Sequence, residues 1–293
     1  MIGRRQVAWW FAAPALVVIG VFFVLPVVAA LAMSLTDFDI YALADISNLR
    51  VVGVRNYVDL LERPLFWKAL GNTLYFVAAG VPLSLGASLG AALLLDSKFA
   101  RFQPFFRTAL FAPVVTTVVA VAVIWRYLLG TRYGYLNYAL GVFGVRPIDW
   151  LGDPRFAMPA IILFAVWKNF GYNMIILLAG LQNIPRELYE AARIDGASAF
   201  ERFRFVTLPM LAPILSIVAI LTVAGYFQLF AEPYVMTQGG PLQSTLSVLY
   251  LMYEEGFKYW NLGSASAVAF LLFLLIFAVT LLQTRAARGE FAR

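Results

Sequence analysis

Apolar runs long enough to cross a lipid bilayer fill most of this 293-residue chain. A helix needs about 20 apolar residues to cross the hydrocarbon layer. Hydrophobic residues make up 62% of the sequence and charged residues 13%, whereas soluble domains average roughly half and a quarter. The sequence predicts an all-α integral membrane protein with one transmembrane domain, residues 1–293. The six expected spans are 7–33, 69–95, 105–127, 157–181, 210–230 and 263–282.

The first apolar run allows two interpretations. Ala30-Leu31-Ala32 resembles the cleavage site of a signal peptide, whose apolar core is about 7 to 15 residues long. The run at 7–33 is longer than that, and Trp9 and Trp10 stand where the aromatic belt of a span belongs. We therefore favour a retained first span.

The chain contains neither histidine nor cysteine. This removes the usual imidazole acid–base group, thiol nucleophiles and most zinc or iron–sulfur ligands. A Gly-x-x-x-x-Gly-Lys-[Ser/Thr] phosphate loop is also missing, so the chain has no nucleotide site of that type. We expect a protein that is not an enzyme and has no cofactor of its own. Its formal charge of +6 is spread over loops beside apolar runs, which is typical of membrane topology and not of nucleic-acid binding.

The distribution of basic residues predicts the orientation of the chain. Lysine and arginine are denser at the two termini, in the turn after the second span and between spans four and five than in the other loops. Loops rich in these residues stay cytoplasmic. We expect both termini and the segment between spans four and five to be cytoplasmic.

That segment, Asn183–Pro213, is unusually charged for this chain. Pro185 suits the first position of a helix, and Gly196 supplies the left-handed residue that ends one. Ser198 and Glu201 have the spacing of a capping box, so a second helix should start there. The segment therefore predicts a helix, a bend and a helix. Such a pair either docks in a groove of another protein or lies in the membrane interface as a connector.

The segment contains Glu190-Ala191-Ala192, Asp195-Gly196-Ala197 and Leu208-Pro209. With these motifs it resembles the EAA loop of binding-protein-dependent ABC transporter permeases. The sequence IPRELYEAARIDGA is similar to the corresponding sequence of carbohydrate-uptake members of the maltose, lactose and glycerol-phosphate type. From the second span to the C-terminus, further motifs resemble these permeases: Asn72-Thr73, Trp150-Leu151, Asp153-Pro154, Phe227-Gln228-Leu229-Phe230, Thr237-Gln238-Gly239-Gly240-Pro241 and Gly263-Ser264-Ala265-Ser266-Ala267.

The resemblance implies a type I ABC importer permease fold, with six transmembrane helices in a bacterial inner membrane. It also implies that residues 183–208, here called the charged loop, form a cytoplasmic coupling loop between helices four and five. The implied partners are a pair of ATPase subunits that bind ATP and Mg, a second permease subunit that is a different chain, an extracytoplasmic solute-binding protein and membrane lipid. The residues implied in ATPase coupling are Glu187, Glu190, Ala191, Ala192, Asp195, Gly196, Ala197, Phe203 and Pro209.

Polar side chains within spans are costly in lipid, so they should face the bundle or a water-filled path. Amides and aromatic rings suit a neutral, hydroxyl-rich ligand, although such groups can equally bond one another between helices. Lys168 is expected to pair or to reach the interface. The candidate path residues are Asn169, Tyr172, Asn173, Tyr226, Phe227, Gln228 and Glu232.

We therefore expect the permease subunit of an ATP-driven sugar importer. The spans hold no cationic cluster, which favours an uncharged sugar over glycerol 3-phosphate or another polar solute. A secondary transporter or channel without an ATPase would need a charged path, and it would leave the charged loop unexplained.

Overall fold

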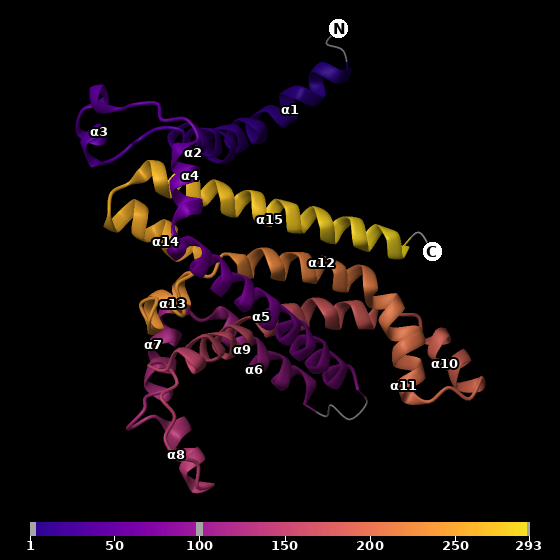
Figure 1. Ribbon diagram of the computed structural model, residues 1–293. Coiled ribbons are helices and arrows are strands. Elements are labelled where there is room, and N and C mark those ends of the chain that lie inside the picture. The colour runs from indigo at the N-terminus through magenta and orange to yellow at the C-terminus, as the bar shows by residue number, and fades with distance from the viewer. Residues whose placement is uncertain (1–3, 98–101, 292–293) are drawn as a thin grey trace. The chain divides into compact units, whose positions relative to one another are not determined.

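The computed structural model describes residues 4–97 and 102–291, and the regular elements in these ranges are all helical (Figure 1). Contacts divide the chain into two compact units, Met1–Trp67 with Leu251–Leu274 and Lys68–Tyr250 with Leu275–Arg293. The first helices are α1 (Arg4–Ile19), α2 (Leu25–Ser34), α3 (Ile40–Ala44), α4 (Arg55–Glu62) and α5 (Pro64–Asp96). They are followed by α6 (Gln103–Val115), α7 (Val118–Leu128), α8 (Tyr135–Val142), α9 (Pro154–Gln182) and α10 (Arg186–Ile194). The last are α11 (Ala199–Arg202), α12 (Leu208–Phe227), α13 (Ala231–Met236), α14 (Val248–Tyr253) and α15 (Leu262–Phe291).

Long apolar helices lie at five of the six predicted span positions. Helical stretches long and apolar enough to cross a membrane cover Trp9–Ser34, Pro64–Asp96, Pro154–Gln182, Ala199–Phe227 and Leu262–Ala287. The helix at the fifth predicted span, 210–230, begins well before residue 210. A π-helical turn at Phe203–Thr207 lets the helix continue through Pro209, which lacks a backbone N–H. The second helix of the charged loop and the fifth span are therefore continuous from Ala199.

The predicted third span, 105–127, is covered by two helices and not by one. Helices α6 and α7 meet at a bend of 100°. At the bend Thr116 and Thr117 have extended backbones, and Thr116 Oγ1 donates a hydrogen bond to the Pro113 carbonyl at 2.6 Å. The bend falls in a run of β-branched residues, 114–119, which have low helix propensity. A threonine hydroxyl that competes for a backbone carbonyl adds to the break.

The segment between the first two predicted spans is ordered by contacts within the unit Met1–Trp67 with Leu251–Leu274. Asn56 Nδ2 donates to the carbonyl oxygens of Ser34 and Thr36, both at 2.8 Å. A Cβ at Gly263 would collide with that Thr36 carbonyl oxygen. The start of α15 and the loop approach too closely for a side chain, which gives a structural reason for glycine at this position.

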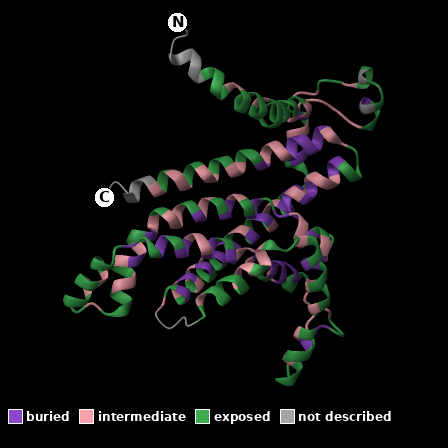
Figure 2. Cartoon of the chain, turned by 180° about the vertical axis from the view of Figure 1, so that it is seen from behind, coloured by how far each residue is buried: buried purple, intermediate pink, exposed green. Residues whose placement is uncertain are grey.

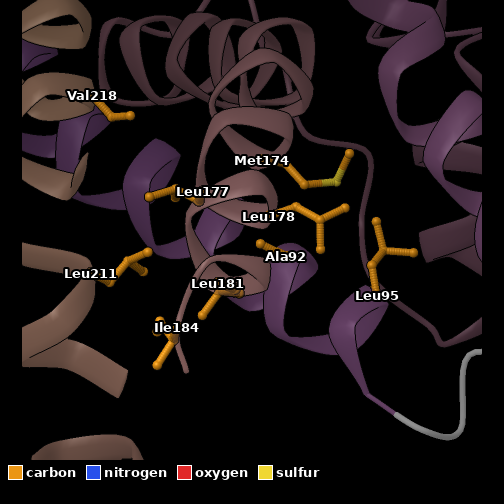
Figure 3. Close-up of a cluster of buried hydrophobic side chains, with 9 residues drawn as sticks. All are labelled: Ala92, Leu95, Met174, Leu177, Leu178, Leu181, Ile184, Leu211 and Val218. Atoms are coloured by element: carbon orange, nitrogen blue, oxygen red, sulfur yellow. The ribbon is translucent and has the colours of Figure 1, made fainter. Parts of the chain in front are cut away.

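The core of the other unit lies between α5, α9 and α12 (Figure 3). Helix α9 is central, because 15 of its 29 residues are buried. Figure 2 colours the buried residues of the chain purple. The leucine and methionine side chains of α9 contact both neighbouring helices. The core cluster consists of Ala92, Leu95, Met174, Leu177, Leu178, Leu181, Ile184, Leu211 and Val218.

Glycines let two helices approach α9 closely. A Cβ at Gly171 would collide with the carbonyl oxygen of Leu110 in α6. A Cβ at Gly180 would lie 2.6 Å from Ile214 Cδ1 and 2.8 Å from Leu211 Cδ1, both on α12. A side-chain tip can turn aside whereas a helix backbone cannot, so Gly171 is the tighter constraint.

Candidate functional site

A cavity of ≈ 360 Å³ lies between α5, α6, α9, α12 and α13, within one unit of the chain. This volume falls in the range of small-molecule sites, about 300 to 1,000 Å³. Amide groups, aromatic rings and one carboxylate line it, with apolar side chains between them. Six of the seven predicted path residues line the cavity: Asn169, Tyr172, Asn173, Tyr226, Gln228 and Glu232. Phe227 does not, because its side chain is buried in the core.

Two of the cavity amides bond only within their own helices. Asn169 Nδ2 donates to the Ala165 carbonyl and Gln228 Nε2 to the Ala224 carbonyl, both at 3.0 Å and one turn back. Neither amide oxygen has a hydrogen-bond donor in the described part of the chain. Each can therefore accept a hydrogen bond from a ligand hydroxyl. Gln228 directly follows the last turn of α12, whereas Glu232 belongs to α13.

Asn173 has a different role from Asn169. Its Nδ2 donates to Thr222 Oγ1 at 2.9 Å, and that hydroxyl donates to the Val218 carbonyl at 2.7 Å. Asn173 and Thr222 are both buried, so this pair ties α9 to α12. The alternative that polar groups bond one another between helices thus holds for Asn173, although it also lines the cavity wall.

Thr222→Val should destabilise the protein by about 0.6 kcal/mol and by no more than about 1.7 kcal/mol, the average and the maximum measured for hydrogen bonds between membrane helices. The replacement leaves the Asn173 amide without its acceptor, and valine has nearly the same shape. Thermal unfolding in detergent measures the change. Thr222→Ser keeps the hydroxyl and should retain most of the stability, and equal losses in both variants would mean that the hydrogen bond contributes nothing.

A second cavity of ≈ 380 Å³ shares Asn169, Gln228 and Glu232 with the first and adds Lys168. Lys168 is 7% exposed, and its Nζ donates to the Val114 carbonyl at 3.1 Å, where α6 ends. Burial raises the pKa of the Glu232 carboxyl, while its own backbone N–H and the Lys168 charge act in the opposite direction. The lysine is thus held by the protein at the bend between α6 and α7.

Aromatic rings hold α7 beside the site. The Trp125 ring of α7 lies 5.5 Å from Phe164 and 5.3 Å from Trp167 of α9, measured between ring centroids. Helix α7 also packs against α13, which carries Glu232. These contacts fix the helix that follows the bend against two walls of the cavities.

The charged loop has the local structure that its sequence predicts. Helix α10 is followed by Gly196 at φ +80°, a left-handed conformation. The Glu201 N–H donates to Ser198 Oγ at 3.3 Å, and the Ser198 N–H donates to Glu201 Oε2 at 2.7 Å. The helix–bend–helix and its capping box are confirmed. Pro185 stands one position earlier than expected, directly before the first helical residue.

Two further contacts fix the bend and were not predicted. The hydroxyls of Tyr189 and Thr207 share a hydrogen bond of 3.0 Å. Arg202 Nη1 donates to the Ala197 carbonyl at 2.5 Å. Tyrosine, threonine and arginine carry no spacing signal here, so only the folded chain reveals these partners.

The outer surface of the charged loop combines apolar and acidic groups. Ile194 is 86% exposed and Phe205 69%. The carboxylates of Glu187, Glu190 and Asp195 are exposed and make no ion pair within the described residues. The other coupling candidates are exposed at Ala191, Gly196 and Pro209 and partly buried at Ala192, Ala197 and Phe203. The charged loop therefore exposes both apolar and acidic side chains.

The pattern of one protein family, the binding-protein-dependent transport system inner membrane component, matches residues 2–290. The chain belongs to this family. It is a multi-pass inner-membrane permease subunit of a transport system and not an enzyme. The match covers nearly the whole chain, so the family resemblance first drawn from short motifs is confirmed.

Individual relatives of this permease are named for sugar transport. It is 37% identical to the lactose transport system permease protein LacF of Rhizobium radiobacter, over 96% of this chain and 93% of the relative. It is 36% identical to the trehalose/maltose transport system permease protein MalF of Thermococcus litoralis, over 94% and 91%. Among solved structures, a bacterial ABC transporter involved in alginate import shares the fold with a TM-score of 0.84 at 19% identity, over 98% and 97%.

The motif Asn72-Thr73 has a visible structural role in this permease. Asn72 Nδ2 donates to the carbonyl oxygens of Gln243 and Leu246, at 2.8 and 2.9 Å. Thr73 Oγ1 accepts from the Val248 N–H at 3.0 Å. Both side chains hold the segment between α13 and α14 against α5, so this motif positions a loop and does not line the cavity.

Proposed function

We propose that this permease forms half of the path of an uncharged sugar across the inner membrane, and that a second, different permease chain forms the other half. The cavity between α9, α12 and α13 carries this proposal. The amides of Asn169 and Gln228 can accept hydrogen bonds from sugar hydroxyls, and the rings of Tyr172 and Tyr226 offer apolar faces. The lactose and trehalose/maltose relatives are named for neutral sugars, which supports the same cargo class.

We propose further that the charged loop docks on a pair of ATPase subunits, which would bind ATP and Mg. Its exposed apolar groups and unpaired carboxylates support a protein partner on this surface. Both termini would then be cytoplasmic with the loop. A solute-binding protein would deliver the sugar from the other side, as the family description implies.

Cysteine labelling tests the path directly, because the chain has no cysteine of its own. Asn169→Cys and Gln228→Cys should react with a thiol reagent in the assembled importer. Lactose, maltose or trehalose supplied with the solute-binding protein should slow the reaction about tenfold at a sugar concentration ten times the dissociation constant. The rate of modification is read from the purified chain.

Tyr138→Cys on α8 is the control, since its side chain is 79% exposed and lies outside both cavities. Its labelling should not respond to sugar. If glycerol 3-phosphate protected the cysteines and the sugars did not, the cargo would be an anion and not an uncharged sugar. Sugar uptake without protection at either cavity position would show that the path lies elsewhere.

A further inference from the structure

The ring of Tyr226 packs against the backbone of α5 at Gly80, where there is no side chain. A Cβ at Gly80 would be 2.6 Å from Tyr226 Cε1 and 3.0 Å from Cδ1. Phe76, one turn earlier on the same helix, stacks on this ring with 5.0 Å between centroids and an interplanar angle of 27°. Tyr226 therefore rests as close to α5 as a glycine permits.

The Tyr226 hydroxyl lies beside the hydroxyl of Ser84 on α5. Its hydroxyl is buried, and so is that of Ser84, one turn beyond Gly80. Neither oxygen makes a hydrogen bond of normal geometry within residues 4–97 and 102–291. The ring lies between the Phe76 ring and the surface of α5, with its hydroxyl beside that of Ser84.

The same ring forms a wall of the cavity. Tyr226 and Phe76 both line it, together with Asn169 and Asn173 of α9. Carbon atoms in contact are normally about 3.5–4.0 Å apart, so a methyl group at position 80 would require the ring to move by about 1 Å. The backbone of α5 blocks movement in one direction, which leaves movement toward the cavity.

We propose that Gly80 determines the size of cargo that the cavity accepts, because the missing side chain lets Tyr226 withdraw from the path. The effect on cargo size rests on the sugar path proposed above. The effect on cavity width concerns only the cavity and can be tested without any sugar. A bulkier residue at position 80 would select smaller cargo through Tyr226, without contacting the cargo itself.

Two thiol reagents of different size measure the width. Asn169→Cys is the reporter in the assembled importer. It is labelled with a large, biotin-bearing methanethiosulfonate and with a small ethylammonium methanethiosulfonate. Gly80→Ala should lower the ratio of the large reagent's labelling rate to that of the small reagent by about tenfold. Gly86→Ala is the matched control on the same helix, because a Cβ there would meet no atom within 4 Å. Adding Tyr226→Ala to Gly80→Ala should restore the ratio, whereas adding Tyr226→Phe should not.

A sugar series then tests selection. Uptake of maltotriose should fall about tenfold more than uptake of maltose in Gly80→Ala, with recovery when Tyr226→Ala is added. Labelling ratios that match those of Gly86→Ala, or that Tyr226→Ala fails to restore, would overturn the role of Gly80 in cavity width. A changed labelling ratio with equal losses for both sugars would overturn its role in selection. Uptake unaffected by every cavity variant would instead contradict the sugar path.

Discussion

Charge reversal in Glu190→Lys should abolish sugar-stimulated ATP hydrolysis while the permease stays in the membrane. Glu190 is exposed on α10 and makes no ion pair in the described chain, so reversing its charge removes no internal contact. At an interface, loss of a buried charge contact costs about 2–5 kcal/mol, and the lower value is already about 30-fold in affinity. Co-purification of the ATPase and hydrolysis by the reconstituted importer measure the effect.

Glu62→Lys provides the control, because Glu62 is also exposed and unpaired at the end of a short helix but lies outside the charged loop. It should leave ATPase binding and hydrolysis unchanged. If the Glu190→Lys importer retained both its ATPase and its stimulated hydrolysis, α10 would not be the docking helix. Equal losses in the two variants would point to a general effect of added positive charge.

Addition of one methyl group in Gly171→Ala should destabilise the fold more than the other substitutions considered. The new Cβ would collide with a backbone carbonyl of α6, so a whole helix must shift. Overpacking of this kind costs about 1–3 kcal/mol, and more where the backbone blocks relaxation. We expect less folded protein in the membrane and a lower melting temperature in detergent.

Gly225→Ala is the matched control, since it adds the same methyl group within α12 where no neighbouring atom lies within 4 Å. Alanine has the higher helix propensity, so this variant should be as stable as the parent or slightly more stable. A Gly171→Ala protein with the same melting temperature as Gly225→Ala would show that α6 and α9 do not pack as closely as described.

Local signals in the sequence predicted much of the fold. Long apolar runs fix helices in lipid, because the backbone must satisfy its own hydrogen bonds there. Caps and left-handed residues act over a few positions, so Gly196 and the pair Ser198 and Glu201 were readable as the bend of the charged loop.

Long-range packing could not be read in this way. Thr222 is one of several hydroxyl residues in apolar surroundings, and nothing in its neighbourhood marks it as the partner of Asn173. The close contact between the Tyr226 ring and Gly80 likewise joins residues far apart in sequence. The bend at Thr116 did have a local signal in its β-branched run, but the hydropathy of that run continues unbroken and hides it.

Because of the bend, α6 is shorter than the hydrocarbon layer of a bilayer is thick. With 13 residues at 1.5 Å per residue, α6 reaches about 20 Å, while the hydrocarbon layer is about 30 Å thick. The buried ammonium of Lys168 is bonded at the end of this short helix, where a full-length span would continue in lipid. The Lys168 ammonium thus supplies a donor to a carbonyl that the broken helix leaves without its usual partner.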